Sequence, residues 1–138
     1  MPGRRRIHVL TGDRGSAVVE FSLMSVLLVM LLFAVLQVAA LFYVRSVAAA
    51  AAADGARYAA NAGVSAQAGG ERASALLGRA LSRGMARELP CAGALVADAD
   101  SGLITTEVRC TGTIRSVFLP LGALVRVDVS GQSLKDDP

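Results

Sequence analysis

The strongest pattern in the chain is a run of 24 positions, from Phe21 to Val44, that contains no charged side chain. The run reads FSLMSVLLVMLLFAVLQVAALFYV, and Gln37 is its most polar member. A helix of this length extends for about 36 Å, whereas about 20 apolar residues are enough to cross the hydrocarbon of a bilayer. If the helix were buried instead, the rest of a 138-residue chain would be too small to enclose it. The pattern therefore predicts a transmembrane span over 21–44.

The helix is expected to continue beyond the apolar run. Residues 45–60 are dominated by alanine, which has the highest helix propensity, and Asn61 and Gly63 are suitable terminators. A helix from Ala17 to Ala60 would be about 65 Å long. Its second half carries a small-residue surface that helices can approach closely. That surface packs either against neighbouring subunits or against a second helix of the same chain, and both interpretations stay open.

A second, amphipathic helix is predicted over 70–89. Leu77, Leu81 and Met85 recur with helical spacing, and Pro90 ends the pattern. A basic stripe with the same spacing runs beside them and consists of Arg79, Arg83 and Arg87. Such a stripe is usually a solvated face. The alternative is contact with anionic lipid head groups or with an acidic partner.

The C-terminal third reads as strands. Apolar and polar residues alternate with period two over 104–110 and again over 125–130, which is typical of strands with one buried face. A turn signal at 98–102 separates the first of these from a shorter apolar pair at Leu95 and Val96. The simplest arrangement is a three-stranded antiparallel sheet that covers the second helix. The expected fold class is therefore α+β.

The charge distribution bears on topology more than the formal net charge of +3 does. Four arginines precede the apolar run and only Asp13 opposes them, whereas acidic and basic residues balance from Ser16 onward. These arginines are Arg4, Arg5, Arg6 and Arg14. Clustered arginine before a first span favours a cytoplasmic N-terminus and an extracytoplasmic C-terminus. Nucleic-acid binding is disfavoured, because the basic cluster is short and has no aromatic partners.

Two cysteines, Cys91 and Cys110, lie on the side of the span that is expected to be exported. A disulfide would persist there and would stabilise the fold by about 3 kcal/mol; two buried free thiols are the alternative. His8 is the one histidine of the chain and precedes the span, so an exported His-based catalytic centre is excluded. No metal, cofactor or enzymatic activity is expected, and the carboxylates of Asp98 and Asp100 suit an ordinary turn better than a cation site.

The junction between the basic segment and the apolar run reads DRGSAVVEF. An ordinary secretory signal has a shorter apolar region followed by a small-residue cleavage site, and the alanines at 48–53 keep that interpretation open. A cut between Gly15 and Ser16 would instead create an α-amino group four residues before Glu20, on the same helical face. Glu20 could then pair with that amine or with the amine of a neighbouring subunit and so set the register between subunits; otherwise it lies in the head groups.

These residues resemble a known family. Gly15, Ser16 and Glu20 match the type IV prepilin pattern, and the stretch from VVEF to DGARYAA is similar to TadE-like proteins, the minor pilins or pseudopilins of tight-adherence (Tad/Flp) pilus systems. Many relatives carry a proline near Val26, which this chain lacks. The resemblance implies a prepilin-type leader over 1–15, a long helix over 16–63 and an exported α+β head over 64–138.

The resemblance also implies a role and a set of partners. The role is that of a pilus-assembly component, and the partners are the lipid membrane, a prepilin peptidase, other pilin or pseudopilin subunits and the Tad assembly platform. The alternative is a single-pass envelope protein that is never cleaved and binds a partner outside the membrane.

Overall fold

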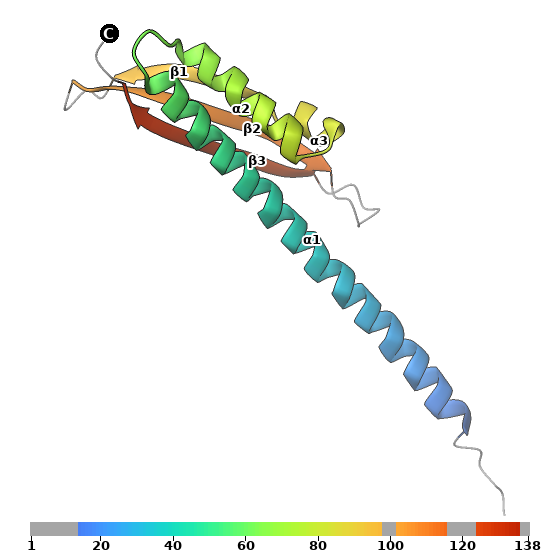
Figure 1. The fold of residues 1–138 in the computed structure, drawn as a ribbon. Coiled ribbons are helices and arrows are strands. Elements are labelled where there is room, and N and C mark those ends of the chain that lie inside the picture. The colour runs from blue at the N-terminus through green and yellow to red at the C-terminus, as the bar shows by residue number, and fades with distance from the viewer. Residues whose placement is uncertain (1–13, 98–101, 116–123, 136–138) are drawn as a thin grey trace, which may run out of the picture. The chain divides into compact units, whose positions relative to one another are not determined.

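A computed structural model describes residues 14–97, 102–115 and 124–135. The elements follow in the order α1 (Arg14–Ala60), α2 (Ala66–Ala80), α3 (Arg83–Arg87), β1 (Cys91–Ala97), β2 (Ile104–Arg115) and β3 (Leu124–Leu134) (Figure 1). The predicted α+β class is confirmed. The chain forms two compact units, which meet in sequence between Val35 and Leu36. The predictions for the turn at Asp98 and Asp100 and for the basic segment up to Asp13 lie outside the described residues.

The first stretch of α1, over 16–35, is exposed on all sides, with Ser25 half-buried. Ser22 and Ser25 donate their hydroxyls to the carbonyl oxygens of Val18 and Phe21, each at 2.8 Å. Their polar atoms are thus satisfied inside the helix, as lipid requires. In the described part of the chain, α1 alone is long and apolar enough to cross a membrane, with a mean hydropathy of 2.7 in its apolar window. The helix continues without a break through Val26.

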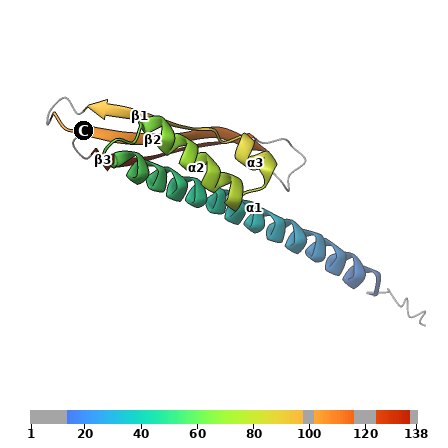
Figure 2. The same ribbon diagram turned by 45° about the horizontal axis from the view of Figure 1, so that its top comes forward.

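The second unit contains the sheet and the helices that cover it. The strands are antiparallel in the order β1-β2-β3, and α2 and the second stretch of α1 lie side by side on one face (Figures 1 and 2). The predicted alternation is confirmed in β2 and β3, where alternate residues are buried against the helices: Thr106, Val108, Cys110, Val127 and Val129. Ile104, which belongs to the same face, remains 48% exposed at the first position of β2.

The predicted single helix over 70–89 is wrong in its bounds. Ser65 caps α2 by accepting a hydrogen bond from the N–H of Ala68 at 3.2 Å, so the helix begins earlier. It ends at Ala80, because Leu81 takes an extended conformation that buries its side chain in the core. Ser82 then caps α3 by accepting from the N–H of Met85. Apolar residues keep their helical spacing across this break, so the spacing alone cannot reveal that the helix is interrupted.

The small-residue surface of α1 packs inside its own unit. The alanines on one face of the helix, from Ala48 to Ala59, are fully or almost fully buried. A Cβ on Gly55 would overlap the carbonyl oxygen of Gly69, and a Cβ on Gly131 of β3 would overlap the backbone of Ala53. Backbones therefore meet at both places with no room for a side chain. The interpretation that this surface packs against the protein's own second helix is confirmed, and the sheet is a further partner.

We expect Gly69→Ala to destabilise the protein by about 1–3 kcal/mol, because its methyl group would overlap Gly55 and Ala59. The matched control is Gly78→Ala on the same helix, where an added Cβ meets nothing within 4 Å. That change should stabilise the helix by up to about 1 kcal/mol. Thermal unfolding of the detergent-solubilised full chain, followed by circular dichroism, measures both. A melting temperature for Gly69→Ala at or above that of wild type would contradict the close crossing.

Candidate functional site

Ser16 and Glu20 lie on one exposed surface of α1. They are one helical turn apart, and Val19, Leu23 and Met24 share the surface with them. Gly15, on the N-terminal side of Ser16, belongs to the first turn of the helix. Glu20 is the sole charged residue between Ser16 and Val44. A carboxylate beside so much apolar surface is costly in a membrane unless a cation or the interface receives it.

Most of the apolar run is exposed, but its C-terminal end also contributes to the core of the second unit. Val44 is 3% exposed and Leu41 packs against the same core, so one face of the last turn of the predicted span belongs to the interior of the second unit, while Phe42 and Tyr43 on the same turn are exposed. The stretch from Phe21 to Ala40 remains for lipid and is about 30 Å long as a helix. This length matches the hydrocarbon thickness of a typical bilayer. The described helix thus suits a single crossing of a membrane, with Glu20 at its N-terminal edge.

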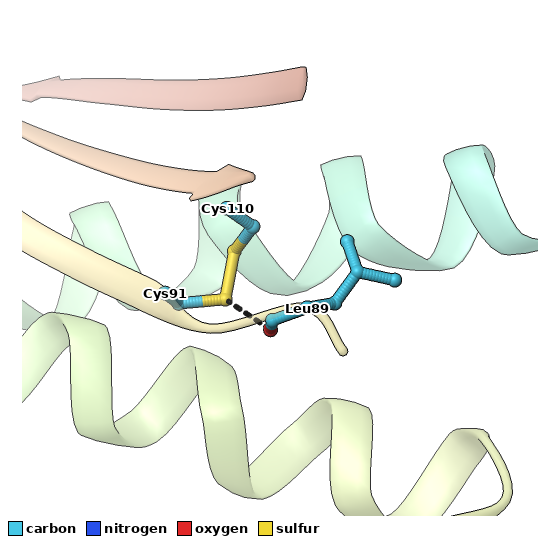
Figure 3. The surroundings of a disulfide bond; sticks show 3 residues. All are labelled: Leu89, Cys91 and Cys110. Atoms are coloured by element: carbon cyan, nitrogen blue, oxygen red, sulfur yellow. Dashed lines mark hydrogen bonds between the residues drawn. A yellow bond between two sulfur atoms is a disulfide. The ribbon is translucent and has the colours of Figure 1, made fainter. Parts of the chain in front are cut away.

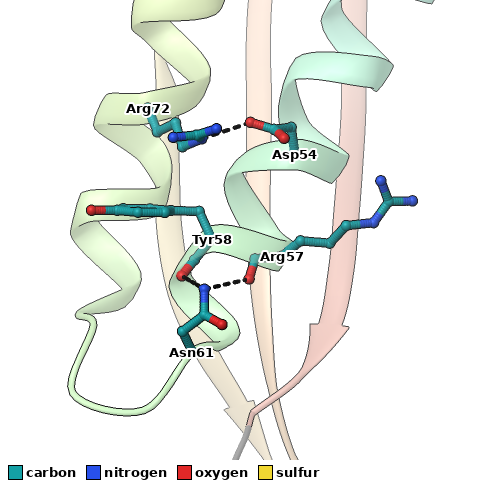
Figure 4. A network of polar contacts seen from close by, with 5 residues as sticks. All are labelled: Asp54, Arg57, Tyr58, Asn61 and Arg72. Atoms are coloured by element: carbon teal, nitrogen blue, oxygen red, sulfur yellow. Dashed lines mark hydrogen bonds and ion pairs between the residues drawn. The ribbon is translucent and has the colours of Figure 1, made fainter.

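The C-terminal end of α1 is tied to α2 by polar contacts (Figure 4). Arg72 donates from Nε to Oδ2 of Asp54 at 2.7 Å, and its guanidinium lies 4.9 Å from the ring centroid of Tyr58. The hydrogen bond and the charge of Asp54 raise the pKa of Arg72 above its ordinary value. Asn61 donates to the carbonyl of Tyr58 at 3.0 Å and to that of Arg57 at 3.4 Å, so it caps the helix. The side chain of Arg57 is exposed and points away from this cluster.

Lys135, at the end of the described chain, also closes the C-terminus of α1. Its Nζ donates to the carbonyl oxygens of Ala59, Asn61 and Val64 at 2.8, 2.8 and 2.7 Å. An ammonium group at this position satisfies carbonyls that have no partner within the helix. Sequence reasoning missed both Lys135 and Arg72. Each acts on a residue that is distant in the chain, and no local pattern points to either contact.

Cys91 and Cys110 form a disulfide that joins β1 to β2 (Figure 3). The two residues are directly paired in the strand register, with Cα atoms 4.1 Å apart. Cys110 is fully buried, and the sulfur of Cys91 lies 3.9 Å from the carbonyl oxygen of Leu89. The bridge therefore fastens the outer strand β1 near the point where the chain leaves α3.

Polar side chains pair with one another on the outer face of the described sheet. Within 14–97, 102–115 and 124–135, no group of three or more His, Cys, Asp or Glu side chains could hold a metal ion. On the face of the sheet opposite the helices, Arg109 contacts Glu107 at 3.2 Å and Asp128 at 4.0 Å. Gln132 donates to Glu107 on the same face. Contacts of this kind on an exposed polar surface contribute little to stability.

These features define an α+β protein with one long N-terminal helix of the kind that anchors a protein in a membrane. A family model described as TadE-like protein matches residues 15–57. The expected resemblance to TadE-like proteins is thereby confirmed for this segment, and it supports a protein associated with a Tad pilus. Comparisons with curated proteins and with solved structures gave no match.

The matched segment begins at Gly15, contains Glu20 and ends at Arg57 in the last turn of α1. It therefore includes both the exposed apolar stretch and most of the surface that packs in the second unit. The elements α2 to β3 lie outside it.

Reduction of the disulfide should lower the free energy of unfolding by about 3 kcal/mol, since the bridge closes a loop of 19 residues in sequence separation. Chemical unfolding of the full chain with and without dithiothreitol measures the difference. The double variant Cys91→Ala with Cys110→Ala is the control and should be insensitive to the reductant. If wild type unfolds identically in both conditions, the bridge is absent or contributes nothing.

Proposed function

We propose that the protein is a minor-pilin or pseudopilin-like component of a Tad-type (type IVc) pilus assembly or secretion system. In this proposal it is processed between Gly15 and Ser16 and is anchored by one N-terminal helix. The observation that carries the proposal is the exposed, apolar first stretch of α1 within a TadE-like match that begins at Gly15. The role is structural rather than catalytic, in line with a family of pilus-associated components.

Glu20 supports processing at this position. A cut after Gly15 places a positive α-amino group on Ser16, one turn from Glu20 on the same surface. In a low-dielectric environment an ammonium and a carboxylate attract each other strongly if both remain hydrogen-bonded. The amine of one subunit would pair with Glu20 of its neighbour and fix the axial register between their helices. Assembly would thereby offset the cost of a carboxylate at the membrane edge.

The proposed topology places the leader in the cytoplasm and the sheet outside the membrane. Arginines before the span favour this orientation. The disulfide supports it as well, because disulfides persist in oxidising compartments outside the cytoplasm. A prepilin peptidase would cut the leader, and other subunits and the assembly platform would receive the processed helix. The lipid membrane is the first partner of the exposed stretch 21–40.

A second candidate is an uncleaved single-pass anchor that binds a partner in the envelope. Its support is that α1 suits a permanent span equally well in length and hydropathy. A secreted form cut within the alanines at 48–53 is disfavoured, because Val44 and Ala48 would leave the core of which they are part. The N-terminal residue of the mature protein separates the candidates, since it is Ser16 after peptidase processing and is upstream of Ser16 in an uncleaved anchor.

Gly15→Arg should abolish processing, because a bulky cation replaces the small residue at the scissile bond. Mass spectrometry of the protein from a strain that contains the peptidase should find wild type beginning at Ser16 and the variant retaining its leader. Gly12→Arg is the matched control and should still be cut. A variant with Arg at position 15 that begins at Ser16 would overturn the proposed site.

Glu20→Ala should leave cleavage intact and reduce incorporation into pili by on the order of tenfold, since the subunit loses the carboxylate that receives a neighbour's amine. Immunoblots of sheared pili and of membranes measure the two effects separately. Ser22→Ala is the control, because the Ser22 hydroxyl already donates to the carbonyl oxygen of Val18 in its own helix. Wild-type incorporation of the Glu20 variant would show that this carboxylate simply lies at the interface.

A further inference from the structure

The strand β1 forms one edge of the described sheet, and the strand register shows which of its backbone groups face outward. The Cα atoms of Cys91 and Cys110 are 4.1 Å apart, the short spacing of an antiparallel pair that exchanges no backbone hydrogen bonds. In the neighbouring pair, the N–H of Thr111 donates to the carbonyl oxygen of Pro90 at 3.2 Å. Even-numbered residues of β1 therefore bond to β2. The backbone N–H and C=O groups that point away from β2 belong to Cys91, Gly93, Leu95 and Ala97.

The sequence of β1 lacks the features that normally protect an edge strand. Its seven residues, CAGALVA, include no charged residue and no proline, and the positions from Ala94 to Ala97 are exposed. The opposite edge strand, β3, carries Arg126 and Asp128. Charged side chains on an edge strand discourage pairing with another chain, whereas an uncharged and exposed edge permits it. Of the two edges of this sheet, β1 is therefore the one suited to accept a further strand.

A groove lies between β1 and the helix α2. The strand contributes Cys91, Ala92 and Gly93 to its lining, and the helix contributes Gln67, Glu71 and Ser74. These three helix side chains are polar and exposed, and Glu71 supplies the negative charge of the lining. The groove thus has backbone hydrogen-bonding groups on one wall and acidic, hydrogen-bonding side chains on the other. Such walls suit an extended peptide that carries a positive charge.

We propose that β1 accepts an extended segment of another protein as a fourth strand of the sheet. The backbone of this segment bonds to the outward groups of Gly93 and Leu95, and a basic side chain on its helix-facing side meets Glu71. In this mode of recognition the main-chain hydrogen bonds supply affinity, and alternate side chains of the added strand supply specificity. The inference adds a binding surface to the proposed function and depends on neither cleavage nor pilus assembly.

A second copy of the chain is a less suitable occupant because of the direction of α1. In the second unit, Val44 and Val125 line one pocket, whereas Lys135 at the other end of β3 bonds to Ala59. The helix therefore runs in the direction of β3, which is also the direction of β1, since both pair antiparallel to β2. Antiparallel pairing of two β1 strands would put the Leu36 ends of the two copies at opposite ends of the joined sheet. Copies that are anchored in one bilayer through α1 need these ends on the same side.

A synthetic peptide tests strand addition directly. The probe is a fluorescein-labelled heptapeptide of alternating valine and threonine with one central lysine, titrated with the full-length protein in detergent micelles. We expect saturable binding by fluorescence anisotropy and slower amide hydrogen exchange at Gly93 and Leu95 in the complex. The same peptide with every backbone nitrogen methylated should bind more weakly by on the order of tenfold, because it cannot donate to the edge of β1.

Two protein variants locate the site. Leu95→Pro removes an outward N–H while leaving the bonds to β2, and should weaken binding by on the order of tenfold. Its control, Leu95→Ala, keeps the N–H and should bind nearly as wild type does. Glu71→Gln should weaken binding of the lysine peptide by up to about fivefold, the effect of one exposed ion pair. A peptide with norleucine in place of lysine should not respond to the change at Glu71.

Absence of saturable binding, or equal binding of the methylated and unmethylated peptides, would overturn the proposal. Unchanged binding of the lysine peptide by Glu71→Gln would contradict the basic specificity. If circular dichroism shows that Leu95→Pro does not fold, the comparison of the two peptides on wild type decides alone. Dimers of wild type in light scattering that Leu95→Pro dissociates would show that a second copy occupies the edge instead.

Discussion

The helix α1 has one stretch suited to lipid and another that packs in a protein core, and this double requirement shapes the rest of the molecule. Over 21–40 the side chains of α1 are largely exposed and apolar, as lipid demands, whereas from Leu41 onward the same helix contributes a face to a packed core. The second stretch of α1 presents alanine and glycine on its buried face, so neighbouring elements can bring their backbones close to it. The crossing of Gly55 with Gly69 and that of Ala53 with Gly131 are two such approaches.

Much of the fold was predictable because it depends on local pattern. The uncharged run, the alanine-rich continuation with its end at Asn61, and the alternation in β2 and β3 all depend on neighbours in sequence. The division between α2 and α3 was not predictable from periodicity. Leu81 keeps its place in the apolar spacing while its backbone leaves the helix, since burial of the side chain and a Ser82 cap compensate for the lost turn.

The functional residues also fall into two groups, those that sequence spacing could predict and those that depend on the tertiary fold. Gly15, Ser16 and Glu20 stand close together in sequence, so their relation on a helix follows from their spacing alone. Lys135 reaches carbonyls more than 70 residues away, and Arg72 reaches an aspartate 18 residues away. Such contacts arise from the tertiary fold and leave no spacing signal. They also close the end of α1, because Lys135 and Asn61 both donate to carbonyl oxygens at that end.

The internal use of the alanine face limits how subunits could associate. Ala48, Ala52 and Ala56 are fully buried within one chain, so this surface is not available to a neighbouring copy unless the core opens. Assembly contacts would then fall on surfaces that the fold leaves uncovered, above all the exposed stretch 16–40. That stretch has a single carboxylate at its N-terminal edge and serines that bond to their own helix. Apolar packing between such helices is nearly indifferent to axial position, because similar side chains recur along their length. A single charge with a single partner is therefore the feature most able to define the register.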